Sequence, residues 1–209
     1  MKIRRLHYPN GLRGKLLKLT GPIFLETLLI LTLGVVDTLM LSHYSDNAVA
    51  AAGVVNQLLN MVNVTAVGTS VMCALYFGAK DTKSFTQVVG VSLLFNAIIG
   101  IIISALLTFG GKQMLVWMDI RPNLMPMAVT YMQIVGGFGF FQAISFTVSA
   151  VLRAANKPNY AMQVTCLINI FNIIGNYSLI YGHFGFPEMG IQGAAISTSV
   201  CRGLGMLFL

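Results

Sequence analysis

The amino-acid sequence predicts an all-α membrane protein in which six transmembrane helices form a single lobe over residues 1–209. Only 9% of the residues are charged, 56% are hydrophobic, and the mean hydropathy is +0.78. A soluble protein of this size would not keep a charged surface with that composition. The third observation is a series of six apolar stretches, each of the length that a bilayer core of about 30 Å requires.

Each predicted helix is an apolar stretch bounded by turn-forming or charged residues. The first, 16–41, contains Pro22, which we expect in the first turn of the helix or at a kink. Connections such as SHYSDNA, FGAKDTKS and RAANKPN are short, so no soluble domain fits between the stretches. The remaining predicted helices are 48–78, 85–111, 125–152, 160–182 and 191–209, and we expect the sixth to be truncated.

Basic residues are concentrated in alternate connections, which predicts the orientation in the membrane. The net charge of +7 comes from basic residues that are spread over several connections and do not form one basic face, so we expect no nucleic-acid partner. By the positive-inside rule, the most basic connections and the N-terminus are cytoplasmic. The residues in these connections are Lys2, Arg4, Arg5, Arg13, Lys15, Lys18, Lys80, Lys83, Arg153 and Lys157.

Motifs for catalysis, disulfides and metal binding are missing from the sequence. Neither HExxH nor GxSxG occurs, so an enzyme is not expected. Cys73, Cys166 and Cys201 each lie inside an apolar stretch without a CxxC pair or a nearby histidine. We interpret them as packing residues and expect no disulfide, metal or other cofactor.

Asp37 is the strongest candidate functional residue, because it is a lone carboxylate deep in an apolar stretch. Glu26 lies eleven residues earlier, so both carboxylates fall on nearly one helix face, about 16 Å apart. A carboxylate among amide and hydroxyl oxygens suits Na⁺ or a titrating proton. Glu26 is nearer the cytoplasmic end, where pairing with Lys15, Lys18 or Arg153 is an equally good interpretation.

Polar residues in three other stretches also recur at helical spacing. Any single amide or hydroxyl is best interpreted as a hydrogen bond between helices. Taken together, the stripes predict a polar cavity whose lining includes Glu26, Asn56, Asn60, Asn63, Asn169 and Gln142. The stripes are Asn56, Asn60 and Asn63; Gln142, Ser145 and Ser149; and Thr165, Asn169, Asn172 and Asn176.

Several motifs, in order along the chain, resemble the N-terminal half of the multidrug and toxic compound extrusion (MATE) transporters. The first stretch, GPIFLETLLILTLGVVDTLMLS, is similar to the first helix of that family, and NAVAAAGV to the start of its second. ALYFGAKDTKS and SAVLRAANKPNYAM look like its cytoplasmic turns. NIFNIIGNYSLIYG and GIQGAAISTSV resemble its fifth and sixth helices.

The resemblance implies a six-helix lobe of a cation-coupled antiporter in a bacterial-type plasma membrane. Family members export organic, often cationic compounds in exchange for H⁺ or Na⁺. The cation site known in some members corresponds here to Asp37, Asn172, Asn176 and Thr198. Asn176 stands where certain relatives have a second aspartate, and the missing negative charge lowers the Na⁺ affinity that we expect and favours proton coupling at Asp37.

The chain length indicates half a transporter, because the resemblance implies twelve spans and the C-terminal lobe is absent. We expect a fragment or truncated form, with a second lobe or a homodimer as the possible partner. Two other interpretations stay open. A lipid-linked oligosaccharide flippase would be expected to carry more intramembrane cations than Arg202 alone. A non-transporting partner subunit would need no competent cavity.

Overall fold

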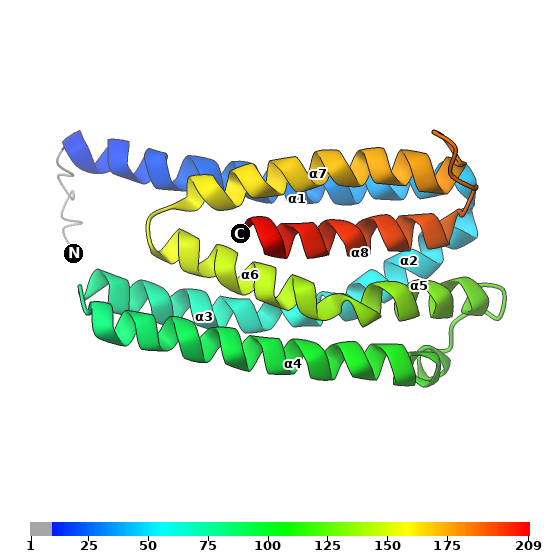
Figure 1. Cartoon of the computed structure of the whole chain (residues 1–209), viewed down its shortest axis with the longest axis horizontal. Coiled ribbons are helices and arrows are strands. Elements are labelled where there is room, and N and C mark those ends of the chain that lie inside the picture. Colours follow the sequence, from blue (N-terminus) through cyan, green and yellow to red (C-terminus); the bar gives the residue numbers. More distant parts are fainter. Residues whose placement is uncertain (1–9) are drawn as a thin grey trace, which may run out of the picture.

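The computed structural model describes residues 10–209, with the side chains of residues 10–13, 15, 16 and 61–66 excluded. Within that range the chain forms eight helices and no strand, which confirms the all-α prediction. Figure 1 shows the helices lying nearly parallel in an elongated bundle.

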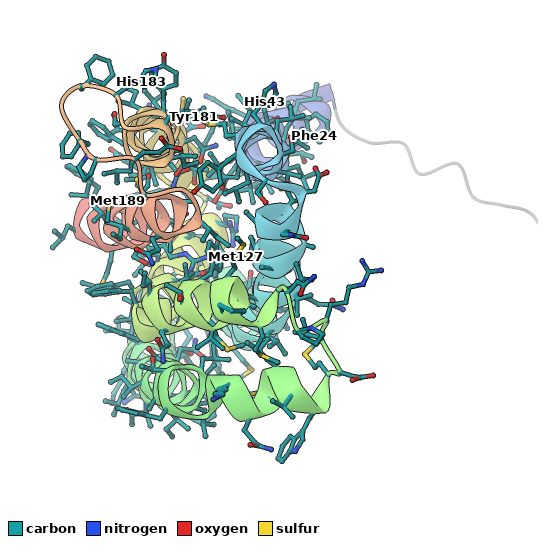
Figure 2. The ribbon with its side chains drawn as sticks, turned by 90° about the vertical axis from the view of Figure 1, so that its right-hand side faces the viewer. Phe24, His43, Met127, Tyr181, His183 and Met189 are labelled. Atoms are coloured by element: carbon teal, nitrogen blue, oxygen red, sulfur yellow. The ribbon has the colours of Figure 1, made fainter. Side chains whose placement is uncertain are left out.

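The chain runs back and forth along the length of the bundle (Figure 1). The connections after α3 and α6 lie at the same end as the start of α1, and these are the basic connections of the sequence. His43 and His183 lie at the other end (Figure 2). The helices are α1 (Asn10–Tyr44), α2 (Asp46–Leu59), α3 (Met61–Gly78), α4 (Thr82–Trp117), α5 (Met125–Gly137), α6 (Gly139–Ala154), α7 (Pro158–Tyr181) and α8 (Ile191–Phe208).

Two of the six expected stretches contain two helices each. Asn60 separates α2 from α3, and Phe138 separates α5 from α6, where the chain bends by 50°. The second break falls in the sequence GGFG, where glycine lowers helix propensity. The Ser104 Oγ on α4 lies 2.6 Å from the carbonyl oxygens of both Gly136 and Gly137. A hydroxyl from a neighbouring helix therefore satisfies backbone groups that the break frees.

Two boundaries extend beyond the expected ranges. Because α1 begins at Asn10, Pro22 lies inside the helix and not in its first turn. Helix α4 continues to Trp117, whereas we expected it to end at 111, so the Gly110–Gly111 pair does not terminate it. A membrane-spanning helix tolerates such residues because neighbouring helices support its backbone.

The outer surface of the bundle is apolar, as expected of a protein surrounded by lipid. Phe109 is 89% exposed and Trp117 is 77% exposed, and many leucines and isoleucines are exposed beside them. Three helical segments are long and apolar enough to cross a membrane: Leu17–Tyr44, Thr82–Trp117 and Pro158–Tyr181. The bent pair α5 and α6 would make a fourth. These features identify an integral membrane protein.

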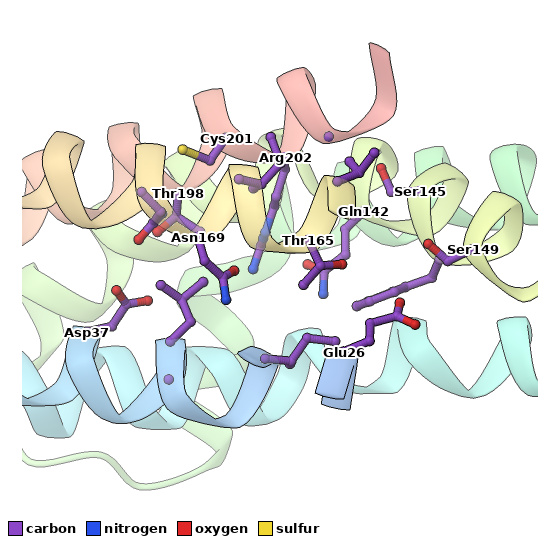
Figure 3. A pocket seen from close by; sticks show the side chains of 18 of the residues that line it. Glu26, Asp37, Gln142, Ser145, Ser149, Thr165, Asn169, Thr198, Cys201 and Arg202 are labelled. Carbon is purple, nitrogen blue, oxygen red and sulfur yellow. The ribbon is translucent and has the colours of Figure 1, made fainter. Parts of the chain in front are cut away.

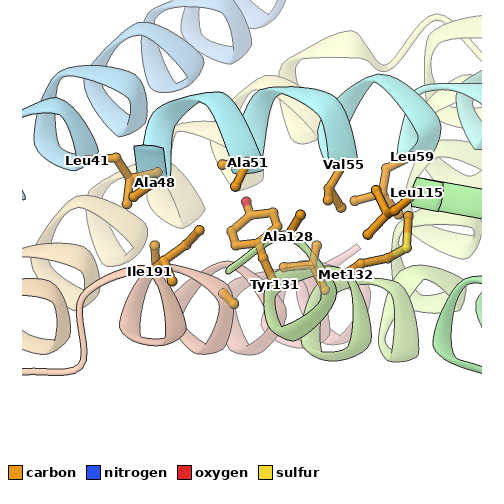
Figure 4. Close-up of a cluster of buried hydrophobic side chains, with 14 of the residues drawn as sticks. Leu41, Ala48, Ala51, Val55, Leu59, Leu115, Ala128, Tyr131, Met132 and Ile191 are labelled. Atoms are coloured by element: carbon orange, nitrogen blue, oxygen red, sulfur yellow. The ribbon is translucent and has the colours of Figure 1, made fainter. Parts of the chain in front are cut away.

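A cluster of buried hydrophobic side chains joins α2, α4, α5 and α8 at one end of the bundle (Figure 4). Val55 on α2 and Met132 on α5 are fully buried within it. Tyr131 belongs to the same cluster and is 4% exposed. This cluster supplies the dry packing that fixes how α2, α5 and α8 meet.

Small residues let α7 and α8 approach closely. A Cβ added at Gly175 would lie 2.5 Å from the Ser197 Oγ, and one added at Gly193 would lie 2.5 Å from the Leu179 carbonyl oxygen. Only glycine fits at either position without separating the helices. Because α7 also packs along α1, it is held between α1 and α8.

The cysteines lie as free thiols: Cys73 and Cys201 are buried and Cys166 is exposed. The packing role that we predicted therefore fits Cys73 and Cys201, whereas Cys166 lies on the surface.

Candidate cation and substrate cavity

A cavity of about 320 Å³ lies between α1, α2, α5, α6, α7 and α8. Its volume is within the range of small-molecule sites. Figure 3 shows Asp37 and Thr198 toward one end of the cavity, Glu26 and Ser149 toward the other, and Arg202 between them. The two carboxylates therefore line one cavity, as their spacing on α1 predicts.

Asp37 is held by an amide chain on α7. The Asn176 Nδ2 donates to the Asp37 Oδ1 at 2.7 Å and lies 3.0 Å from the Asn172 Oδ1. Asn176 and Asn172 are one helical turn apart, so they lie on the same face of α7. Both are buried, at 1% and 2% exposure. Thr198 on α8 lines the cavity on the Asp37 side. Hydrogen bonds thus join Asp37, Asn176 and Asn172, and Thr198 lines the same cavity as Asp37.

The Glu26 end contains an ion pair. The Arg153 Nη1, near the end of α6, donates to the Glu26 Oε1 at 2.9 Å. The glutamate side chain is 4% exposed and the arginine side chain 28% exposed. Of the three cations that we considered for Glu26, Arg153 is the one that pairs with it among the side chains that the structure describes.

Three polar contacts position α1 against α7. Besides the Asp37 contact, the Asn169 Nδ2 donates to the Leu29 carbonyl at 2.8 Å. Toward the other end of α1, the Tyr181 hydroxyl donates to the Met40 carbonyl at 2.7 Å. The carboxylate contact thus lies between two contacts that use only the backbone of α1.

The predicted lining residues can now be placed individually. Asn56, Asn60, Asn169 and Gln142 all line the cavity with Glu26. The side chain of Asn63 lies outside the described residues. All three residues of the α6 stripe and Thr165 of the α7 stripe line it as well. The lining members of these two stripes are Gln142, Ser145, Ser149, Thr165, Asn169 and Asn172.

Arg202 and Tyr131 also line the cavity, although the sequence did not place them there. The Arg202 guanidinium interacts electrostatically with Asp37 and Tyr131, and Tyr131 has polar contacts with Asn56 and Thr198. A signal for Arg202 was present, because it follows Thr198 by four residues and so lies on the same helix face. Tyr131 precedes the α5–α6 break, across which helical spacing fails.

The chemistry of the site suits a proton or a transient monovalent cation. No group of three or more histidine, cysteine or acidic side chains within the described part of the chain could hold a metal ion. The Asp37 carboxylate and the Thr198 hydroxyl are hard oxygen donors that line the cavity, whereas Asn176 presents its amide NH₂ to Asp37.

Comparisons with known proteins agree with this architecture. A protein-family model described as MatE matches residues 22–178. The chain is 43% identical over 210 residues to "Uncharacterized transporter YisQ" of Bacillus subtilis, covering 99% of this chain and 46% of that protein. It is 32% identical over 200 residues to "Probable multidrug resistance protein NorM" of Thermotoga maritima, covering 93% and 43%.

A solved structure described as the outward-facing conformation of a multidrug resistance MATE family transporter of the MOP superfamily has the same fold. It aligns with a TM-score of 0.83 at 22% identity, over 93% of this chain and 43% of that one. The chain therefore spans less than half the length of each of these three proteins.

Proposed function

This chain belongs to the MatE family, and on that premise we propose that it is the N-terminal lobe of a cation-coupled exporter of organic, often cationic compounds. The MATE resemblance of its motifs is thereby confirmed, and members of this family are transporters, not enzymes. Names such as "Multidrug resistance protein PmpM" of Pseudomonas aeruginosa describe relatives that are 29% identical. We extend drug export from such relatives to this chain as part of the proposal.

The observation that carries the proposal is the Asp37 carboxylate, held at 2.7 Å by Asn176 in a cavity lined by five further amide side chains. A charged side chain is costly in a membrane, so the few that occur there usually have a function. Binding a cation at Asp37 changes the contact between α1 and α7. The ion shifts the equilibrium between two conformations of the lobe by as much as it binds one of them more tightly than the other. The favoured conformation would bind the organic compound less tightly and so release it.

We infer that the coupling ion is H⁺ rather than Na⁺. The Asn176 Nδ2 donates to Asp37, so Na⁺ at that position would need the amide to turn and present its oxygen. A proton on the other carboxylate oxygen needs no such change. Asn176 also adds no second negative charge, which a hard cation would prefer.

The proposed orientation places the basic connections and the N-terminus in the cytoplasm, in a bacterial-type plasma membrane. The partner is then a second lobe or a second copy of this chain, facing the cavity. Alternating access needs two units that move against each other. A non-transporting subunit is the competing interpretation, and the oligomeric state in nanodiscs would address it.

Of the alternatives, the flippase interpretation has the weaker support. Recognition of a pyrophosphate would call for several free cations in the cavity. In the described part of the chain, Arg202 is the sole basic residue that lines the cavity. Arg153 pairs with Glu26 and is therefore not a free cation. One guanidinium suits a smaller or less charged ligand.

The test is ethidium efflux from a bacterial strain that lacks its own efflux pumps and expresses this chain under imposed H⁺ and Na⁺ gradients. Asp37→Asn should abolish efflux at unchanged membrane abundance, because the amide cannot take up a proton. Asp46→Asn, at the exposed start of α2, is the matched control. Efflux by Asp37→Asn at the wild-type rate would remove Asp37 from the mechanism, and efflux driven by Na⁺ alone would overturn H⁺ coupling.

A further inference from the structure

The last turns of α4 leave the direction of the bundle. Figure 1 shows them end-on beside the connection to α5, and Figure 2 shows them running across the long axis. We place the change of direction at Gly110–Gly111, because pairs of small residues such as glycine are a usual cause of sharp helix bends. A Cβ at Gly111 would collide with the Met132 sulfur of α5. The residues beyond the pair, KQMLVWM at 112–118, are named the terminal segment of α4.

The position of this bend matches the thickness of a membrane. Helix α4 has 36 residues and would be about 54 Å long if it were straight. A bilayer with its headgroups is only about 40–45 Å thick. The part from Thr82, next to the basic connection, to Gly110 is about 43 Å long. Helix α4 can therefore cross the whole membrane up to Gly110, and the terminal segment begins at the opposite membrane surface.

The terminal segment is amphipathic. Its apolar side occupies an arc of about 160° on the helix, at about 100° per residue. One edge of this arc packs against the bundle, because Leu115 is fully buried in the hydrophobic cluster and Met114 packs against it. The other edge is open, since Trp117 is 77% exposed and Met118 is 43% exposed. The remaining side of the segment contains Lys112, Gln113 and Val116.

The open edge of the terminal segment fits the boundary between lipid and water. Phe109, just before the bend, is 89% exposed, so the lipid-facing surface of α4 continues into Trp117. Tryptophan is enriched at membrane surfaces because its ring is both apolar and able to donate a hydrogen bond. Lys112 on the other side is exposed and can extend its ammonium toward water. Helices with two such sides lie in the plane of the membrane surface.

We propose that the terminal segment of α4 is an interfacial anchor, which lies in the plane of the membrane surface with Trp117 and Met118 among the lipid headgroups and upper acyl chains. The anchor holds the end of α4 at a fixed depth. Its contact with α5 at Met132 transmits that depth to the helix that presents Tyr131 to the cavity. The partner is thus the lipid surface itself. This inference goes beyond the proposed function, and it does not depend on transport.

The depth of Trp117 can be measured without a label. Trp117 is the only tryptophan of the chain, so its fluorescence reports this one position. The 209-residue chain would be placed in nanodiscs of phosphatidylcholine brominated near the headgroup, at mid-chain or at the chain end. We expect the strongest quenching by bromine near the headgroup, because interfacial helices are buried by about 5–10 Å.

Two results with the wild-type chain would overturn the proposal. Strongest quenching by bromine at the chain end would place Trp117 in the hydrocarbon core. Absence of quenching by any brominated lipid would show that water or another protein surface, such as a second copy of the chain, covers Trp117. Neither result depends on whether a variant folds.

A second tryptophan position tests the bend. Ile102 is 53% exposed on the membrane-spanning part of α4, so Ile102→Trp in a Trp117→Phe background moves the fluorophore to that part. If the terminal segment lies in the membrane plane, this tryptophan should be about 12 Å deeper than Trp117. A straight helix would give a depth difference of about 22 Å, and that result would refute the in-plane anchor.

A matched pair of variants tests which side of the segment faces lipid. Met118 and Val116 flank Trp117, are 43% and 50% exposed, and lie on opposite sides of the segment. Met118→Glu should weaken quenching by bromine near the headgroup and shift Trp117 emission to the red, because the charge draws this edge toward water. Val116→Glu should leave both signals unchanged. Equal changes in the two variants would contradict the proposed orientation.

Discussion

Replacing Arg153 with methionine should destabilise the bundle more than replacing its partner Glu26 with methionine. The reason is the unequal exposure of the two side chains, 28% for the arginine and 4% for the glutamate. Without Arg153, the glutamate stays enclosed between helices with neither counter-charge nor water. Without Glu26, the long arginine side chain can turn its guanidinium toward the membrane surface.

The magnitudes follow from that asymmetry. Breaking a buried pair by removing one partner costs about 3–5 kcal/mol, because the other charge is left uncompensated. Since Arg153 is partly exposed, we expect about 3 kcal/mol for Arg153→Met and about 1 kcal/mol for Glu26→Met. The double variant should lose about 1 kcal/mol, because it leaves no buried charge behind.

The free energy of unfolding would be measured by titrating SDS into detergent micelles while following helicity by circular dichroism. A double-mutant cycle then isolates the pair from the separate effects of each replacement. If Arg153→Met lowers the free energy of unfolding no more than Glu26→Met does, then Glu26 is hydrated in the native state. The enclosed ion pair would then be the wrong description of this end of the cavity.

Three further predictions concern the coupling site, the helix contacts and a loop. Asn176→Asp places a second carboxylate beside Asp37, so the variant should bind Na⁺ and its melting temperature should be higher in NaCl than in choline chloride. A wild-type chain whose melting temperature already rises with Na⁺ would contradict H⁺ coupling. Gly175→Val should lower the free energy of unfolding by about 1–3 kcal/mol because its side chain pushes α8 away, whereas Gly90→Val, where a Cβ meets open space, should lower it clearly less. Equal losses of unfolding free energy in SDS titration would refute the close packing of α7 and α8. Asp81 caps α4, and hydrogen bonds to its carboxylate lower its pKa, so its stabilisation of the fold is present above the ordinary aspartate pKa and is lost as the pH falls through the lowered pKa. NMR titration of its carboxyl carbon should show the lowered pKa.

The cavity could be predicted from the sequence to the extent that it depends on helical spacing. Asp37, Glu26 and the α7 amides lie on uninterrupted helices, where residues three, four, seven or eleven apart share a face. Their convergence also required the α1–α7 pairing, which no single-chain pattern reveals and which the family resemblance supplied.

The features that were missed depend on contacts between helices. The α5–α6 break is tolerated because the Ser104 hydroxyl reaches the freed carbonyls, and periodicity cannot show that a neighbour will do so. Arg202 was considered only as a test of the flippase interpretation, although its spacing from Thr198 placed it on the cavity face. Which of three cations would pair with Glu26 depended on where α6 ends, and that is a tertiary property.

The separation between the dry cluster and the cavity has a consequence for how this lobe can change over evolutionary time. The side chains that hold α2, α5 and α8 together are mostly different from those that line the cavity. Lining positions can therefore acquire new side chains, and with them new ligands, while the bundle keeps its stability. Tyr131 is the exception, since it belongs to both sets. We expect it to accept few substitutions, because any change there alters stability and ligand preference together.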